Sequence, residues 1–468
     1  MRETILSELV DAEFPHGAVP TLAIIDTGTK QVWEQCHPPK VERRCILVRS
    51  CFLRPAHFER AAGFLAHDDR GGYLDRLRVA HMFRTAMELF GRETILSTYR
   101  AFWLKWAEQL AYAFIHRLPH CGDNTSNIAL DGKLLDFGAM TAVPSWARIS
   151  AMLSAPPVGE NVATLIEAIT VHARHLAHHV DPNVGTPARI RATVSQAVQH
   201  YQLAVLREML RVSGLTRRQA ESLLASKDRA ELVSILGRLL NRFRREQFAI
   251  FDGTPEPRIP WDIDRLWSES PPEHLRSLQE FLIRNLDLYR GMEPKDQLLR
   301  ALVRRCTMRT LTRSELYRER IKKDLFRILE NDLAGDALNQ QSLDQLISAT
   351  VCRNRRDSKV ELDGAICIGF ARNACVGYAL FRCLDTAEEF AIKEWDSSGE
   401  TQCDRDAQSI SGGNPERLYI AEIHSGGILF ASSAAPEFSG AVWLMPVPEY
   451  SKTEGTEFTV KGNVSRPF

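Results

Sequence analysis

Apolar residues recur every three to four positions through most of this chain, from about residue 55 to about residue 292. That spacing is typical of amphipathic helices, and we expect helices to continue to about residue 350. The pattern commits the chain to a mainly helical core, because each helix must bury its apolar face. The segments that carry it are 56–67, 73–91, 101–118, 161–180, 190–214, 229–251 and 272–291. A stripe of large side chains is expected to be core: Phe102, Trp103, Trp106, Leu110 and Phe114.

A small strand region precedes the helices. Residues 3–12 suit a short helix. Residues 21–34 read as two strands around a hairpin turn at Asp26-Thr27-Gly28, and residues 43–53 as another strand.

The composition changes again near residue 358, where strand patterns alternate with Gly- and Ser-rich turns. The sequence therefore predicts an α+β protein with a first domain over 1–335, a second over 345–468 and a boundary near 335–355. The strands expected in the second domain lie within 365–384, 417–432 and 440–450.

Charge and cysteine content exclude several classes of protein. The chain has 59 basic and 59 acidic residues, so we expect neither nucleic acid nor a membrane surface as a partner. No apolar run approaches the roughly 18 residues of a membrane span, and the start of the chain lacks an apolar signal segment. The ten cysteines form no CxxC pair, which indicates reduced thiols in a cytoplasmic protein.

The stretch 117–140, "RLPHCGDNTSNIALDGKLLDFGAM", carries the chemistry. Phosphoryl and nucleotidyl transfer need a metal ion on the phosphates, and Mg²⁺ takes hard oxygen ligands. Asn127 and Asp136 offer such oxygens, and Asp131-Gly132 between them predicts a small hairpin that brings both to one metal position. His120 is expected to orient the loop backbone. A surface loop with capping Asn and Asp residues is the alternative.

This stretch resembles a loop of the selenoprotein-O-like family, which reads like H-G-V-x-N-T-D-N-M-S-I-x-G-x-x-I-D-Y-G. Two upstream segments, "RETILSELVDAEFPHGAVPTLAIIDTG" and "ILVRSCFLRPAHFERAAGF", are similar to the same family in order and spacing. The resemblance covers roughly residues 2–145, and residues 146–290 only as generic helices. It implies a protein-kinase-like pseudokinase fold, with a truncated strand region over 1–54 and a helical lobe over 55–335. It also implies Mg²⁺-dependent transfer of AMP from ATP to a protein or peptide acceptor.

The same resemblance assigns roles to single residues. It places Arg54 and Arg49 on the nucleotide phosphates, although the match of Arg49 requires a deletion, and it makes Glu3 the kinase-fold glutamate. Ser126 falls where the family has its general-base Asp, and a hydroxyl cannot accept a proton as a carboxylate does. Asp123, three residues earlier, is the candidate substitute. Exposed strand or helix positions are the simpler alternative for the charged residues.

Two parts of a kinase-like nucleotide site precede the matched segments in that family, the glycine-rich strands and the ATP-gripping Lys. We therefore expect an incomplete site, or a hetero-partner that supplies the missing lobe. The first helix should then leave an apolar edge around Ile5, Leu6 and Leu9, which a partner or self-association would bury.

Three functions stay open at this point. The first is AMP transfer to a protein hydroxyl. The second is a carboxylate-adenylating subunit of a peptide-modification complex of the microcin-maturation kind, which would need no strong base because a carboxylate is already a nucleophile. The third is an inactive pseudoenzyme that serves as a partner-binding scaffold. The missing Lys favours the third, whereas the Asn127 and Asp136 pair argues against it.

One further pattern could hold a metal. His172, His175 and His179 share a helical face at a spacing that can bind a metal ion. Arg174 between them would repel a cation, so an amphipathic helix is the preferred interpretation.

The C-terminal region is faintly similar to the acyltransferases that modify lysines of RTX toxins. Ala421 falls where those enzymes have a catalytic Asp, with Glu422 one place away, and no His matches theirs. An inactive copy used for binding and an unrelated α+β module both stay open.

Overall fold

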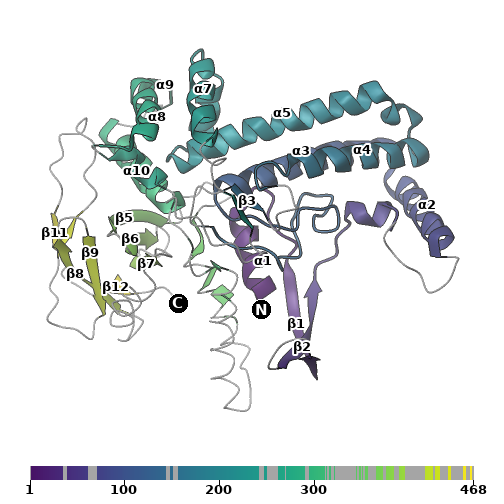
Figure 1. Ribbon diagram of the computed structural model, residues 1–468, viewed down its shortest axis with the longest axis horizontal. Coiled ribbons are helices and arrows are strands. Elements are labelled where there is room, and N and C mark those ends of the chain that lie inside the picture. Colours follow the sequence, from purple (N-terminus) through teal and green to yellow (C-terminus); the bar gives the residue numbers. More distant parts are fainter. Residues whose placement is uncertain are drawn as a thin grey trace.

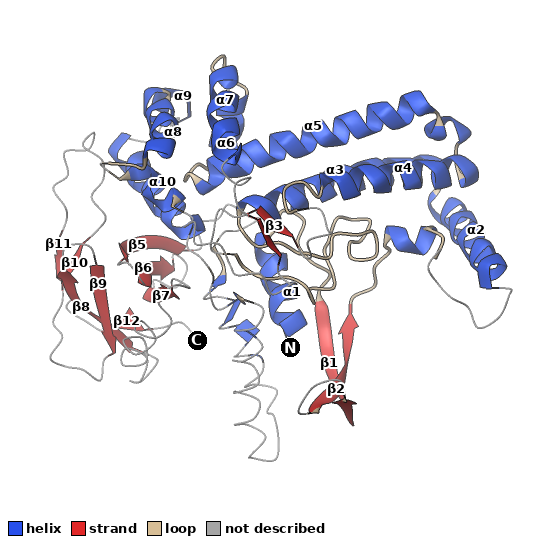
Figure 2. Ribbon diagram, viewed as in Figure 1, coloured by secondary structure: helices blue, strands red, loops and turns tan. Residues whose placement is uncertain are grey.

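The structure is a computed structural model of the 468-residue chain. Its described parts form an α+β molecule that is rich in helices, with strands near the start and toward the end (Figures 1 and 2). The predicted fold class is confirmed at that level. The described residues are 2–34, 39–61, 71–143, 148–150, 157–241, 247–249, 262–268, 270–289, 295–310, single positions up to 356, and strand segments between 365 and 465.

Three long helices pack against one another and form the main body: α3 (Arg92–Ile115), α4 (Val162–His179) and α5 (Pro187–Val212) (Figure 1). The apolar stripe predicted on α3 lies in the core, with Phe102, Trp106 and Leu110 at most 1% exposed. The helix α2 (Gly71–Phe90) packs at one end of this body.

The first helix, α1 (Arg2–Glu13), is covered by the chain itself. Ile5, Leu6 and Leu9 are at most 1% exposed and belong to the same hydrophobic cluster as the side chains of α3. The prediction of an exposed apolar edge on this helix is therefore wrong, because other parts of the same chain cover these side chains.

Strands β1 (Thr21–Trp33) and β2 (Lys40–Arg49) form an antiparallel ribbon that projects from the body (Figure 1). The hairpin turn predicted at Asp26-Thr27-Gly28 is wrong, since one strand runs through these residues and its pairing slips after Asp26. Gly28 has a φ of +67°, and its N–H donates to the Asp26 carboxylate at 2.9 Å. The same residue types serve a bulge as readily as a chain reversal.

Several large apolar side chains of this ribbon are exposed to solvent. Two cross-strand pairs are among them, Ile25 with Ile46 and Val32 with Val41, and all four side chains are 47–55% exposed. Leu22 is 65% exposed. A two-stranded sheet of this kind is marginally stable alone and has open edges. We call β1 and β2 together the apolar ribbon.

Shorter helices follow α5: α6 (Arg217–Leu224), α7 (Arg229–Leu240), α8 (Glu273–Arg284), α9 (Leu286–Tyr289) and α10 (Lys295–Thr310). The single helix predicted over 229–251 is wrong, because residues 247–249 form strand β4, which pairs in parallel with β3 (Arg148–Ser150). A short apolar run suits a strand or a helix equally, and periodicity cannot separate them.

The helix predicted over 56–67 is also wrong at its start, where the structure has a single 3₁₀ turn, Pro55–Phe58. Glu59 is extended after that turn, and its side chain makes contacts described below. Residues 62–67 lie outside the described residues.

The C-terminal part contains short antiparallel strands, as predicted. Those expected within 365–384 and 417–432 are confirmed as two strands in each segment, and residues 441–443 form another. The side chains of Ala421 and Glu422 and most of the expected boundary at 335–355 lie outside the described residues. The strands are β5 (Ala365–Arg372), β6 (Val376–Cys383), β7 (Glu389–Trp395), β8 (Arg417–His424), β9 (Gly427–Ser432), β10 (Ala441–Trp443), β11 (Glu457–Thr459) and β12 (Val464–Ser465).

In the part of the chain that is described, no helix is both long and apolar enough to span a membrane.

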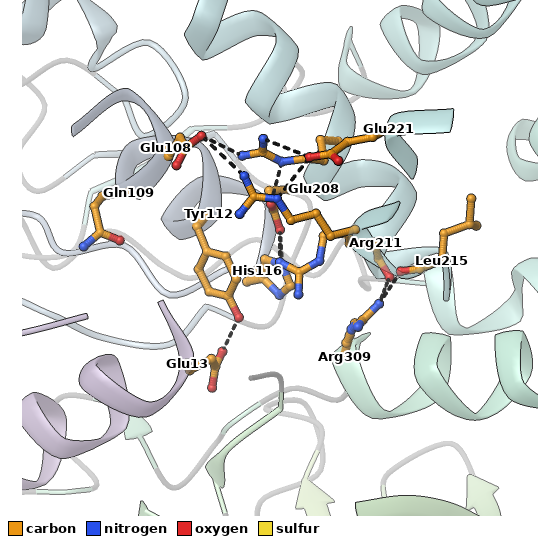
Figure 3. A network of polar contacts seen from close by, with 12 residues as sticks. Glu13, Glu108, Gln109, Tyr112, His116, Glu208, Arg211, Leu215, Glu221 and Arg309 are labelled. Atoms are coloured by element: carbon orange, nitrogen blue, oxygen red, sulfur yellow. Dashed lines mark hydrogen bonds and ion pairs between the residues drawn. The ribbon is translucent and has the colours of Figure 1, made fainter. Parts of the chain in front are cut away.

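A buried polar network joins α3 to α5 (Figure 3). Glu108 of α3 accepts a hydrogen bond from Arg207 of α5 at 3.2 Å. Glu208 contacts His116 Nε2 at 3.1 Å and Arg211 Nη1 at 3.0 Å. Burial alone would raise the pKa of Glu208, but Arg211 and His116 lower it to about 2, so this carboxylate stays charged.

The network extends to α1 through an aromatic side chain. Tyr112 of α3 stacks on His116 and donates its hydroxyl to the Glu13 carboxylate at 2.8 Å (Figure 3). The end of α1 is thereby tied to the helix that precedes the 117–140 stretch.

Candidate functional site

Residues 127–136 form the small hairpin that Asp131-Gly132 predicts. Its arms pair in antiparallel fashion, and the Leu135 N–H donates to the Asn127 carbonyl at 3.0 Å. The glycine of the turn has a φ of +92°, a conformation that favours glycine. The hairpin therefore places Asn127 at the end of one arm and Asp136 at the end of the other.

Two elements hold this hairpin in place. The Gln109 amide of α3 donates to the carbonyls of Gly17 and Gly132, each at 3.0 Å. The Val19 N–H donates to the Leu134 carbonyl at 2.9 Å. The segment after α1 thus lines one edge of the hairpin, which fixes α1 relative to it.

The side chain of Asn127 is oriented by its neighbours. Its Nδ2 donates to the Gly122 carbonyl at 2.9 Å, and only the NH₂ end of an amide can do so. Its Oδ1 accepts from the Ser126 hydroxyl at 3.2 Å and keeps a second lone pair. The amide oxygen is therefore available to a cation.

Asp136 is exposed, and its backbone has an uncommon conformation. Its φ is +63°, in the left-handed region that non-glycine residues rarely adopt. The next residue, Phe137, is fully buried, with its ring centre 5.4 Å from that of His120. Such conformations persist where the surroundings enforce them, often at functional sites. Here Phe137 is buried while the Asp136 side chain stays exposed to solvent.

His120 connects the two arms of the site. It is buried, and its Nδ1 accepts from the Gly122 N–H at 3.2 Å. Its Nε2 therefore carries the proton and donates to the Leu135 carbonyl at 3.1 Å. The ring orients backbone on both sides of the hairpin.

Glu3 and Arg49 lie beside Asp136. The Arg49 Nη2 is 2.7 Å from Glu3 Oε2, and its guanidinium carbon is 5.9 Å from the centre of the Phe137 ring. A methyl group on Gly138 would lie 3.2 Å from Asp136 Oδ1 and 3.8 Å from Glu3 Oε1. The structure therefore brings three of the predicted residues together around Gly138.

Arg54 contacts the 117–140 loop at Ser126. Its Nη1 donates to the Ser126 carbonyl at 2.7 Å, while its buried Nε has no hydrogen-bond partner among the described residues. A buried donor without a partner is unfavourable. Burial and the charges of Arg54 and Arg78 lower the pKa of His57, so this neighbouring imidazole adds no positive charge near pH 7.

The two candidates for a general base have separate contacts. Asp123 accepts from the Asn161 amide, just before α4, at 3.0 Å. The Ser126 hydroxyl contacts the amide oxygens of Asn124 and Asn127. Within the described residues no hydrogen bond joins Asp123 to Ser126. The structure thus places Ser126 beside the metal-ligand candidate and Asp123 beside α4.

Glu59, which the sequence did not single out, supports the 117–140 loop at Thr125. Glu59 accepts from the Thr125 hydroxyl at 2.8 Å and from His172 Nε2 at 2.6 Å, and Trp103 donates to His172 Nδ1 at 3.1 Å. Burial raises the pKa of Glu59, but the bonds from His172 and Thr125 outweigh it, and the pKa lies below its ordinary value. The one signal in the sequence that could have indicated these contacts is a charged residue directly after the buried Phe58.

The first histidine of the α4 cluster is engaged by protein partners. His172 is buried with both ring nitrogens engaged, and the rings of His175 and His179 stack with centres 6.5 Å apart. Among the residues that the structure describes, no three His, Cys, Asp or Glu side chains gather in a way that could hold a metal ion. Asn127 and Asp136 remain as a pair of oxygen donors.

Comparison with known proteins assigns no family to this chain. No protein-family model matches it, and a search of curated proteins found no match. The resemblance to the selenoprotein-O-like family stays a prediction.

Proposed function

We propose that this protein binds Mg²⁺-ATP and transfers AMP from it to a protein or peptide acceptor. The proposal is carried by the hairpin, which has Asn127 and Asp136 at the ends of its two arms, and by the position of Asp136 beside the Glu3–Arg49 pair. A carboxylate and an amide oxygen suit Mg²⁺, which usually takes one or two protein ligands and completes its shell with water and phosphate oxygens. When bound, the metal would neutralise charge on the phosphates.

The kinase-like fold is part of this proposal. Its support is the order of parts along the chain: a helix with a buried face and Glu3 at its start, an antiparallel ribbon that ends at Arg49, and a hairpin between Asn127 and Asp136. Arg54 and Arg49 supply positive charge for the phosphates, since guanidinium groups bind phosphate oxygens in a two-point fashion.

The contacts of Ser126 and Asp123 favour one class of acceptor. The Ser126 hydroxyl is no base near neutral pH, and Asp123 is bonded to Asn161. A peptide carboxylate needs no deprotonation, so its oxygen can attack the α-phosphorus while the bond to pyrophosphate breaks. The products are an acyl-adenylate and pyrophosphate. A hydroxyl acceptor would require Asp123 to leave Asn161 and accept a proton.

The apolar ribbon supports a second candidate, a partner-binding scaffold without catalysis. Its side chains Leu22, Ile25 and Ile46 are at least 50% exposed, and its open edges suit the addition of a strand from another chain.

Labelled ATP tests these proposals. The full chain is incubated with Mg²⁺ and either α-³²P- or γ-³²P-ATP, alone and with a cell extract as a source of acceptors. We expect label from the α position only, lost in Asp136→Asn and retained in Asp131→Asn. Asp131 is a matched control because it lies at the turn of the same hairpin, exposed, and caps the Lys133 N–H. Label from the γ position would identify a kinase, and label from neither would favour the scaffold.

A further inference from the structure

The turn 124–127 ends at Asn127, and hydrogen bonds within the turn fix its shape. The Asn127 N–H donates to the Asn124 carbonyl at 3.1 Å, and the Ser126 N–H donates to the side-chain oxygen of Asn124 at 2.9 Å. These bonds join the start of the turn to its end, so its residues move together. The place where Thr125 is held therefore decides where the amide of Asn127 lies.

Residues 54–59 hold this turn at its backbone and at one side chain. The Ala56 N–H donates to the Thr125 carbonyl at 3.3 Å, and Arg54 donates to the next carbonyl at 2.7 Å. The side-chain contact is the bond from the Thr125 hydroxyl to Glu59 Oε2, at 2.8 Å. A hydrogen bond to an ionised carboxylate is about twice as strong as one between neutral groups. Glu59 therefore offers Thr125 a stronger acceptor than a backbone carbonyl would.

Side chains from α2, α3 and α4 hold Glu59 in turn. His172 of α4 contacts the other carboxylate oxygen, Oε1, at 2.6 Å, and Trp103 of α3 donates to the second nitrogen of that imidazole at 3.1 Å. Arg78 of α2 donates to the Glu59 carbonyl at 2.6 Å. The side chains of His172 and Glu59 are 1% and 18% exposed. The carboxylate thus connects the helical body to the turn, with one oxygen bonded to each.

We propose that Glu59 is a positioning residue of the candidate metal site. Through Thr125 it holds the turn 124–127 so that Asn127 presents its amide oxygen to Mg²⁺. Among the described residues no hydrogen bond joins Glu59 to Asn127 or to Asp136, so Glu59 acts through Thr125 and not as a ligand. The inference rests on the proposed function, because Mg²⁺ is the ion which that function requires.

Nuclear magnetic resonance of the full chain without nucleotide tests the positioning directly. The side-chain amides of asparagine are labelled with ¹⁵N, and Asn127→Asp identifies the Asn127 signals by their loss. Thr125→Val removes the hydroxyl and keeps the outline of the side chain. We expect it to move the Asn127 signals toward those of a free amide, because the bond from Asn127 Nδ2 to the Gly122 carbonyl, 2.9 Å long, is disturbed.

Two control variants should leave these signals in place. Thr125→Ser keeps the hydroxyl that Glu59 accepts from. Thr170→Val removes a hydroxyl from α4 that donates to the Ile166 carbonyl at 3.0 Å, away from the turn. Glu59→Ala should move the Asn127 signals as Thr125→Val does, and the double variant should move them no further, because both changes break the same bond.

A second measurement connects the turn to the metal. In calorimetric titration with ATP at a series of Mg²⁺ concentrations, we expect Thr125→Val to need roughly 10- to 100-fold more Mg²⁺, a loss typical of residues that orient a metal ligand. Thr125→Ser and Thr170→Val should need the same Mg²⁺ as the unaltered chain. Thermal unfolding shows whether each variant is folded, and Thr125→Val decides the question if Glu59→Ala is not.

Failure of this inference can be told from failure of the proposed function. Asn127 signals that stay in place in Thr125→Val overturn the inference, and so do signals that move while the Mg²⁺ requirement stays the same. If Asp136→Asn abolishes Mg²⁺-ATP binding and Thr125→Val changes neither quantity, the inference is overturned and the proposed function stands. If the signals move in a chain that binds no Mg²⁺-ATP, the positioning of Asn127 is supported and the proposed function is overturned.

Discussion

The carboxylate of Glu13, at the end of α1, forms a two-point ion pair with the guanidinium of Arg313, 300 residues further along the chain. The distances are 2.5 and 3.1 Å, and both side chains are at most 2% exposed. The backbone N–H of Arg356 adds a donor at 3.1 Å. The helix that carries Glu3 is therefore anchored by a segment from far along the sequence.

Glu13→Gln should lower the free energy of unfolding by about 3–5 kcal/mol, because it leaves the buried Arg313 charge without its partner. Urea denaturation measures the change, provided that the slope m is unchanged. The control is Glu8→Gln on the same helix. Burial and Asp11 raise the pKa of Glu8, so its charge is unfavourable in the folded state and Glu8→Gln should not destabilise the protein. Equal losses in both variants would contradict the anchoring role.

The depressed pKa of Glu208 predicts a window of acid sensitivity. A carboxylate with a folded pKa near 2 and an ordinary pKa of 4.5 contributes fully above pH 4.5 and loses that contribution as the pH falls toward 2. The total is roughly 3 kcal/mol. In Glu208→Gln, stability should fall less steeply between pH 4.5 and 2 than in Glu221→Gln, whose carboxylate is half exposed. Urea unfolding at a series of pH values gives both slopes. Parallel slopes would refute the assignment.

Trp103 and Glu59 together set the tautomer of His172. An indole N–H can only donate, so Nδ1 of His172 must accept, and Nε2 carries the proton that it shares with Glu59. Nitrogen NMR at pH 8 should show the Nε2–H form alone. Trp103→Phe should shift the Nδ1 resonance, because that nitrogen loses its donor, while the Glu59 carboxylate keeps the proton on Nε2. Trp106→Phe, on the same helix and packed on Phe102, should leave the signal unchanged. An Nδ1–H signal in the unaltered protein would disprove this arrangement.

Most helices could be predicted because apolar spacing records which face of a segment is buried. The α3 stripe that includes Trp106 is an example. The failures have local causes. Asp26-Thr27-Gly28 suits both a turn and a bulge, and the apolar run at 247–251 suits both a helix and the strand that pairs with β3. That pairing joins residues about a hundred positions apart, and no local pattern contains it.

In the candidate site, too, local features could be predicted from the sequence and long-range contacts could not. The 127–136 hairpin was predictable because its turn residues and spacing are local. The bonds of Arg49 to Glu3 and of His172 to Glu59 span 46 and 113 residues, and each partner alone looks like an ordinary surface residue. The expected exposure of Leu9 failed for a related reason, since only the folded chain shows what covers α1.

The separation of Glu13 from Arg313 also orders events during synthesis. Translation at about 5–20 residues per second delays the counterion by about 15–60 s after Glu13 has left the ribosome. A carboxylate buried without its counterion is strongly unfavourable, so we expect α1 to take its final place only after Arg313 has been made. We therefore expect the corner where Glu3 meets Arg49 to be among the last parts of the molecule to assemble, although its residues are among the first to be made.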